Sequence, residues 1–364
     1  MRRLSGRVLC NEGWVQGHLE FTDRIVSIVP DAQARGPILL PGFVDLHVHG
    51  AKGVDIMAGG NSAETVARAH ARHGTTSLLG TTMTAKVRAI ETALQGLRGV
   101  MDAPAPDAAR VLGVHLEGPY ISLHKLGAQP AEVLAATLAQ VSEFHAMAPI
   151  RVLTLAPEVP GHLELIPALT ALGIRVQLGH SAGTYEDGVA ALRAGAAGFT
   201  HLYNGMSSLR HREPGMVGAA LAHAEYAELI PDLEHVHPGA LLAALRCIPR
   251  AYGVTDATAA TGMPDGEYAL GTQRVYKCLG CVRLATGSLA GSALTMDQAL
   301  CNFVSLGLDL ADASRRLSRF PADFIGATDR GRIEVGAYAD LVAVDDNLNV
   351  EQVFLEGRPL ETGQ

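Results

Sequence analysis

Short runs of apolar and β-branched residues recur along the middle of the chain, and most of them end at a polar side chain or a turn. Longer alanine-rich segments alternate with them, a pattern typical of parallel strands covered by helices. The runs are 43–49, 76–81, 111–117, 151–156, 174–180, 198–202, 227–230 and 251–256. Segments 64–73, 131–146 and 185–194 fit the helices between them. Eight such units predict an α/β fold, a TIM-like (β/α)₈ barrel with its active site at the C-terminal strand ends.

Both ends of the chain carry a different pattern, made of short β-like segments separated by turn residues. These segments are 7–10, 17–21, 24–29, 339–344 and 350–357. Neither end has enough apolar surface to fold alone. We therefore expect residues 1–41 and 337–364 to form one small β-sandwich domain, and residues 42–336 to form the barrel.

Composition narrows the class of protein. The 364 residues are 48% hydrophobic and 18% charged, which is enough to bury a large core. The net charge of −8 gives no bulk attraction to nucleic acid or to an anionic membrane. No apolar run reaches the roughly 18 residues of a membrane span, and the N-terminus lacks a secretory signal. Five cysteines are too few for a disulfide scaffold, so we expect a cytoplasmic protein.

Six polar residues fall at predicted C-terminal strand ends. His47 and His49 are two apart, so their imidazoles lie on the same side of a strand. For any one of the six, a capping or core-satisfying role is the simpler interpretation, but six on one rim predict a metal site. Imidazole and carboxylate ligands suit zinc, iron or manganese. The six residues are His47, His49, Glu117, His180, His201 and Asp256.

Longer motifs surround these residues. They are PGFVDLHVHG at 41–50, HLEGPYIS at 115–122, LGHS at 178–181, THLYNGMS at 200–207, REPG at 212–215, VTDAT at 254–258 and LAGSALTM at 289–296. Over nearly the whole chain they resemble the N-acetylglucosamine-6-phosphate deacetylases of the amidohydrolase superfamily. HLEGP, THLYN and REPG are specific motifs, whereas His-x-His alone is not.

The resemblance implies which residues hold metal. Glu117, His180 and His201 would bind the main divalent ion, and His47, His49 with Asp256 a second, so one or two ions per subunit remain open. Zinc is the first expectation, with iron and manganese as alternatives. Many amidohydrolases bridge two metals with a carboxylated lysine, but none of the four lysines lies at a predicted strand end. Glu117 stands where a bridging carboxylate is needed.

The resemblance also implies the reaction, in which Asp256 is the catalytic residue. Asp256 accepts a proton from water and then delivers it to the departing amine. His235 polarises the acetamide carbonyl, and Arg212 binds the phosphate together with Asn204 and the backbone N–H of Gly205. The family's matching arginine reaches a neighbouring subunit, which implies a homodimer. The implied substrate-binding residues are Asn204, Gly205, Arg212, His235, Gln129, Ala128 and Leu289.

Two departures from the family pattern concern sugar selectivity. Gln129 stands where many relatives have histidine, and the DGxH motif is replaced by Asp232-Leu233-Glu234-His235. The predicted reaction converts N-acetylglucosamine 6-phosphate into glucosamine 6-phosphate and acetate, as part of amino sugar metabolism. The closest alternative is the same reaction on another phosphorylated N-acetyl amino sugar, such as the galactosamine epimer.

Two further alternatives come from other classes. An amidohydrolase that opens a cyclic amide or deaminates a base is disfavoured by the missing bridging lysine and by Arg212 with Asn204. A non-catalytic barrel that senses an amino sugar phosphate is disfavoured because binding alone requires neither Asp256 nor a metal.

Overall fold

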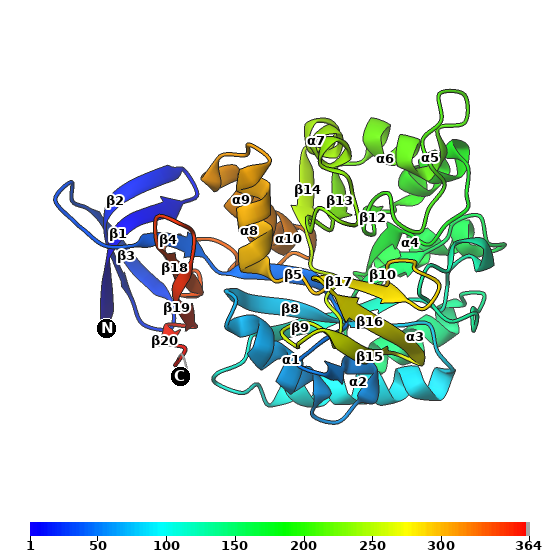
Figure 1. Cartoon of the computed structure of the whole chain (residues 1–364), viewed down its shortest axis with the longest axis horizontal. Helices are drawn as coiled ribbons and strands as arrows, with labels where there is room; N and C mark the ends of the chain where they lie inside the picture. Colours follow the sequence, from blue (N-terminus) through cyan, green and yellow to red (C-terminus); the bar gives the residue numbers. More distant parts are fainter. Residues whose placement is uncertain (362–364) are drawn as a thin grey trace.

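The computed structural model describes residues 1–361, and its larger part is the predicted barrel (Figure 1). The eight strands are β5 (Phe43–Val48), β8 (Thr75–Thr82), β9 (Arg110–Glu117), β10 (Ile150–Leu155), β11 (Arg175–Leu178), β12 (Gly198–Phe199), β13 (Tyr226–Leu229) and β14 (Arg250–Gly253). Six of them form a parallel sheet in the order β5-β8-β9-β10-β11-β12, and β13 pairs with β14. The predicted α/β barrel is confirmed.

Backbone hydrogen bonds join these two sheets near the C-terminal ends of the strands. The backbone N–H of Leu202 donates to the carbonyl oxygen of Glu228 at 2.8 Å, which links the chain after β12 to β13. The N–H of Asp256 donates to the carbonyl oxygen of His47 at 2.9 Å, which links the chain after β14 to β5. Both bonds fix residues at the mouth of the barrel, where the predicted site lies.

Helices cover the barrel from outside, so strands such as β5 and β8 are buried along their whole length. Helix α3 begins at Leu138, later than the predicted 131, because the side chain of Thr137 accepts from Gln140 N–H and caps the helix there. Among the described helices, none is both long and apolar enough to cross a bilayer. The helices are α1 (Ser62–Ala71), α2 (Val87–Asp102), α3 (Leu138–Met147), α4 (His162–Ala171), α5 (Tyr185–Ala194), α6 (Gly215–His223), α7 (Pro238–Cys247), α8 (Met296–Ser305), α9 (Leu310–Leu317) and α10 (Arg319–Phe324), with 3₁₀ turns η1 (Ile56–Ala58) and η2 (Leu123–Lys125).

Strands from both termini form the small β part at one end of the molecule (Figure 1). They are β1 (Arg2–Cys10), β2 (Gly13–Phe21), β3 (Ile25–Pro30), β4 (Ile38–Pro41), β18 (Leu341–Val344), β19 (Val350–Leu355) and β20 (Arg358–Pro359). One continuous sheet holds them in the order β20-β19-β18-β4-β1-β2-β3. Antiparallel pairing of β4 with β18 joins the two ends of the chain. The domain limits 1–41 and 337–364 remain a prediction, and residues 362–364 lie outside the described residues.

Small antiparallel sheets follow two of the barrel strands. The short pair β6 (Gly50–Ala51) and β7 (Val54–Asp55) comes directly after β5. Between β14 and α8 lies a three-stranded sheet of β15 (Gly266–Leu270), β16 (Gln273–Cys278) and β17 (Cys281–Leu284), which the sequence analysis did not predict. Its apolar residues Leu270, Val275 and Val282 pack with Met83 from the end of β8. This sheet thereby forms part of the wall of the site.

Candidate active site

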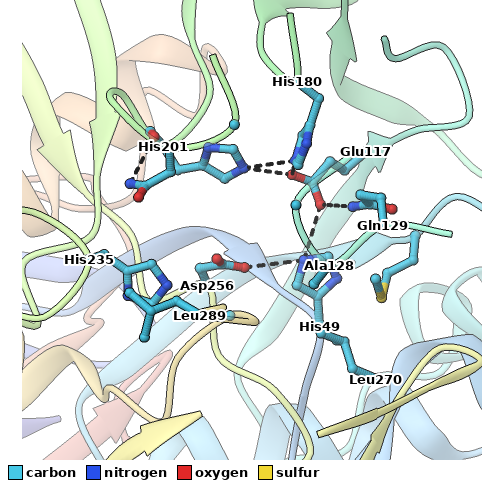
Figure 2. A pocket seen from close by; sticks show the side chains of 15 residues that line it. His49, Glu117, Ala128, Gln129, His180, His201, His235, Asp256, Leu270 and Leu289 are labelled. Atoms are coloured by element: carbon cyan, nitrogen blue, oxygen red, sulfur yellow. Dashed lines mark hydrogen bonds and ion pairs between the residues drawn. The ribbon is translucent and has the colours of Figure 1, made fainter. Parts of the chain in front are cut away.

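The six predicted ligand residues converge at the mouth of the barrel. Figure 2 labels all of them except His47. Glu117, at the end of β9, lies at the centre of the cluster. Its Oε1 atom is 3.0 Å from Nε2 of His180 and 2.9 Å from Nε2 of His201. Its Oε2 atom is 3.3 Å from Nε2 of His49 and 3.5 Å from Nε2 of His47. One carboxylate therefore presents one oxygen to each of two histidine pairs, the arrangement of a bridging ligand.

Asp256 completes the second group. Its Oδ1 atom is 3.2 Å from Nε2 of His49 and 3.5 Å from Nε2 of His47, and those two nitrogens are 3.2 Å apart. Ligand atoms around a tetrahedral zinc ion, at about 2.0–2.1 Å from the metal, lie about 3.3 Å from one another. The spacing of both groups is therefore compatible with a divalent cation in each.

The outer nitrogens of two histidines show which tautomer each adopts. Nδ1 of His180 is 2.8 Å from the carbonyl oxygen of Lys125, and Nδ1 of His47 is 3.0 Å from Oε2 of Glu228. Both partners accept, so each Nδ1 carries a hydrogen, and in its neutral form each ring directs an Nε2 lone pair at Glu117. Lone pairs that face a carboxylate repel it unless a cation lies between them. This donor set fits a bound metal ion.

Charge in the cluster shifts the pKa of its histidines. Burial by itself lowers the pKa of His47, but three neighbouring carboxylates raise it well above its usual range. They belong to Glu117, Asp256 and Glu228. For His49, burial also acts downward, and Asp256 with Glu117 raises the pKa to about 9. Without a metal, protons therefore compensate these carboxylates, and a divalent ion must displace them to bind.

Three of the ligand residues have a backbone conformation that is uncommon for residues other than glycine. The φ angles are +46° at His180, +28° at His201 and +51° at Asp256. Strands β11, β12 and β14 end two or three residues before them, earlier than the sequence predicts. Such left-handed positions cost about 1–3 kcal/mol each and are concentrated at functional sites. Tight turns after the strands thus direct these side chains into the mouth of the barrel.

A cavity opens beside the ligand residues and is lined by most of the predicted substrate-binding residues. Besides Gln129, these are Ala128, Asn204, Gly205, His235 and Leu289. Nδ1 of His235 lies 2.6 Å from Oδ2 of Asp232, which leaves Nε2 available to a ligand. Burial lowers the pKa of His235, but the hydrogen bond and charge of Asp232 outweigh it and raise the pKa. The raised pKa increases the share of protonated His235, the form that can donate from Nε2 to a carbonyl oxygen.

Gln129 contacts Glu117 directly. Its Nε2 donates to Oε2 of Glu117 at 2.7 Å (Figure 2). Its Oε1 accepts from the N–H of Thr84 at 2.8 Å. Its amide is therefore engaged with a metal-ligand candidate, and the predicted contact of Gln129 with a sugar remains a prediction.

Arg212 does not line this cavity. It is exposed and lies on a separate cavity, with Lys125, Tyr185, Arg210 and Glu213 among its neighbours. The structure of one chain therefore does not bring Arg212 together with the six ligand residues. Its role in phosphate binding stays a prediction that requires a second copy of the chain.

The sequence analysis missed Glu228, which is fully buried on β13. Its Oε2 atom accepts from Nδ1 of His47 and, at 3.1 Å, from the backbone N–H of His201. The available signal was a single acidic residue inside the apolar run Ala227-Glu228-Leu229-Ile230. A buried carboxylate in such a run requires a partner.

The chain belongs to the Amidohydrolase family, whose model matches residues 38–360. It is 39% identical to N-acetylgalactosamine-6-phosphate deacetylase from Escherichia coli O157:H7, over 97% of both proteins. It is 41% identical to N-acetylglucosamine-6-phosphate deacetylase from Vibrio furnissii, over 90% of this chain and 84% of that protein.

Solved structures of N-acetylglucosamine-6-phosphate deacetylases are similar to this chain in fold and sequence. The crystal structure of N-acetylglucosamine-6-phosphate deacetylase from Thermotoga maritima superposes with a TM-score of 0.92, at 31% identity and 99% coverage of both chains. A mutant of the Mycobacterium smegmatis enzyme in complex with N-acetyl-D-glucosamine-6-phosphate superposes with a TM-score of 0.91, at 32% identity and 98% coverage of both. The predicted family is confirmed, and the protein is an enzyme of the amidohydrolase class.

Proposed function

We propose that this enzyme hydrolyses N-acetyl-D-glucosamine 6-phosphate to D-glucosamine 6-phosphate and acetate with the help of one or two divalent cations. The observation that carries the proposal is the Glu117 carboxylate, which faces His180 and His201 with one oxygen and His47 and His49 with the other. Relatives that act on this substrate match the chain over nearly its full length.

Two groups of residues would hold the ions. Glu117, His180 and His201 form the first, and His47, His49 with Asp256 form the second. Zinc suits these ligands best, and iron or manganese would also accept them. A divalent ion bound here lowers the pKa of a water molecule and polarises a carbonyl group.

Asp256 is the proton carrier of the reaction. Burial raises the pKa of Asp256, but the surrounding histidines, His47 foremost, outweigh it and keep the carboxylate ionised. It accepts a proton from the attacking water as the water oxygen bonds to the acetamide carbon. When the C–N bond breaks, Asp256 returns this proton to the sugar nitrogen, which leaves as a free amine beside acetate. Protonated His235 donates to the carbonyl oxygen as negative charge develops there.

The phosphate of the substrate needs donors beyond this centre. Asn204 and Gly205 line the cavity. Gly205 has a φ of +60°, and a Cβ at this position would lie only 3.0 Å from Nδ1 of His180, so the site favours glycine. Arg212 would complete the phosphate site from a second copy of the chain, which makes the working enzyme a homodimer. Similarity to the Escherichia coli N-acetylgalactosamine-6-phosphate deacetylase supports the galactosamine epimer as the alternative substrate.

Amine release tests the proposal. Metal-loaded protein is assayed with N-acetylglucosamine 6-phosphate, its unphosphorylated form and N-acetylgalactosamine 6-phosphate. We expect fast release from the first, slow release from the second, and a KM raised for phosphorylated sugar in R212A but not in the exposed control R98A. Preference for the epimer would keep the chemistry and change the substrate. No release from any of the three, with metal bound, would contradict the proposal.

A further inference from the structure

Glu228 is the only one of the three carboxylates around His47 that lies outside both candidate ion groups. It is fully buried, and both of its oxygens have partners. Oε2 accepts from Nδ1 of His47 at 3.0 Å and from the N–H of His201 at 3.1 Å. Oε1 accepts from the hydroxyl of Tyr252 at 3.4 Å. Glu228 therefore contacts one member of each ion group.

We propose that Glu228 is a positioning residue that creates the second ion site and sets its place relative to the first. The inference rests on the proposed function, because it takes both groups to be ion sites. Glu228 would act through His47, whose Nε2 faces the second site, and through the backbone of His201, whose Nε2 faces the first.

The tautomer of His47 is the first step of the argument. A neutral imidazole has one N–H, and a carboxylate at Nδ1 can only accept it. The Nε2 lone pair then points at His49, Glu117 and Asp256. Without Glu228, a hydrogen on Nδ1 would be buried with no acceptor, whereas a hydrogen on Nε2 would find two carboxylates at 3.5 Å. His47 would then turn its hydrogen toward the site and exclude the second ion.

The backbone of His201 is the second step. Its φ of +28° is costly for a histidine, and the N–H at this turn is directed to Oε2 of Glu228. The next N–H, that of Leu202, donates to the carbonyl oxygen of Glu228 itself. Glu228 thus fixes both the connection between β12 and β13 and the position of the His201 ring, which faces the first ion site.

A different arrangement is an ion held by Glu228 itself, together with His47 and His115, which also lie close enough to share one. Both nitrogens of His115 are already engaged, Nδ1 with the carbonyl oxygen of Leu46 at 3.0 Å and Nε2 with the hydroxyl of Thr154 at 2.8 Å. Nδ1 must donate to that carbonyl and cannot also bind a cation. We therefore assign Glu228 to positioning and not to ligation.

The test compares E228Q and E228L with the wild type. Glutamine keeps an oxygen that accepts from Nδ1 of His47, whereas leucine removes it. Y252F is the matched control, because it removes only the contact to the other oxygen of Glu228. Ion content is measured by inductively coupled plasma mass spectrometry, and the affinity of each zinc ion by competition with a chelator.

We expect two ions per chain in the wild type, in Y252F and in E228Q. In E228L we expect the second ion to bind about 10- to 100-fold more weakly, while the first stays bound. Equal affinities in E228L and the wild type would overturn the proposal, as would equal weakening of both ions or a third ion in the wild type. A wild type that holds one ion also overturns it but leaves the deacetylase proposal intact, whereas a wild type that holds none overturns both.

A second measurement applies if E228L does not fold. Long-range ¹H–¹⁵N NMR of histidine-labelled, zinc-loaded wild type reports the protonation of each ring nitrogen. Protonated Nδ1 on His47 is expected, and assignment of the signal uses H47N. Unprotonated Nδ1 on His47 would overturn the proposal.

Discussion

Two buried ionic clusters in this protein are built in opposite ways. At the junction of the small sheet and the barrel, Arg330 contacts Asp340 and Glu356 at 2.5 Å each, and Arg110 contacts Glu356 at 2.9 Å. Guanidinium groups there supply fixed positive charge and several N–H donors. At the mouth of the barrel, the carboxylate of Glu117 faces imidazole nitrogens instead.

The difference distinguishes a structural cluster from a reactive one. The junction is compensated by side chains of the protein itself, so it stabilises the fold without a ligand. At the mouth, His47 and His180 direct their Nδ1 hydrogens away from the cluster, to Oε2 of Glu228 and to the carbonyl oxygen of Lys125. Their Nε2 atoms face Glu117. Such a cluster is suited to bind a divalent cation. Counting buried charges alone would not separate the two.

Breaking the reactive cluster gives the largest expected effect. D256N keeps the size of the side chain but removes the carboxylate that carries the proton. We expect kcat to fall about 10²- to 10⁴-fold, with the ion at Glu117, His180 and His201 still bound. Amine release and ion content check this, with D107N, at an exposed ion pair with Arg68, as the control. Near-normal turnover in D256N would refute the assigned role.

Breaking the structural cluster comes next. R330M leaves Asp340 buried without its cation, and such a loss costs about 3–5 kcal/mol in the free energy of unfolding. Urea unfolding should show this loss, while the folded variant retains its ion content. R98M removes an exposed i,i+4 pair with Asp102 and should change stability little. Loss of ions in folded R330M would mean that the two clusters are not independent.

A smaller effect is expected from loss of the hydrogen bond between Gln129 and Glu117. Q129A removes the hydrogen bond to Glu117 and leaves the N–H of Thr84 without its acceptor. A hydrogen bond to a charged group contributes about 1.5–3 kcal/mol, so kcat/KM should fall about 10- to 100-fold. Q298A, on the exposed face of α8, serves as the control. Unchanged kinetics in Q129A would show that Gln129 does not hold Glu117 in place.

The smallest effect concerns pH at the junction. Burial raises the pKa of Glu356, but Arg110 and Arg330 outweigh it and lower the pKa from 4.5 to about 2. For Asp340, which is fully buried, burial outweighs Arg330 and the pKa is raised. A lowered carboxyl pKa contributes stability that is full above about pH 4.5 and is lost as the pH falls toward 2.

The comparison of wild type with E356Q isolates this contribution, because Asp340 is present in both. The wild type should be more stable at neutral pH, and the difference should shrink below pH 4.5, as measured by urea unfolding across this range. E267Q, at an exposed pair with Arg274, should show almost no difference. A constant difference at all pH values would show that charge on Glu356 is not its cause.

The sequence predicts much of this architecture because strand runs and strand-end residues follow local pattern. All eight barrel strands and the convergence of six ligand residues could be predicted in this way. The left-handed turns at His180, His201 and Asp256 could not, since each depends on the hydrogen bonds that surround it. Glu228 becomes meaningful only when β13 lies beside β12 and the Glu228 side chain meets that of His47 from β5. The sheet of β15 to β17 was missed although Val275, Tyr276 and Val282 flank the two-residue turn Leu279-Gly280, a pattern typical of a β-hairpin.

Arg212 is the predicted site residue that lies apart from the ligand residues. Its exposed loop lines a different cavity. The phosphate-binding role that the motifs predict by resemblance would require a second copy of the chain.

Removal of metal tests the central claim most directly. The protein is treated with a chelator, its lack of ions is verified by mass spectrometry, and amine release from N-acetylglucosamine 6-phosphate is measured before and after zinc, iron or manganese is restored. The account predicts that release stops without ions and returns with at least one of these metals, while urea unfolding still shows the stabilising effect of Arg330. Full amine release from verified ion-free protein would contradict it.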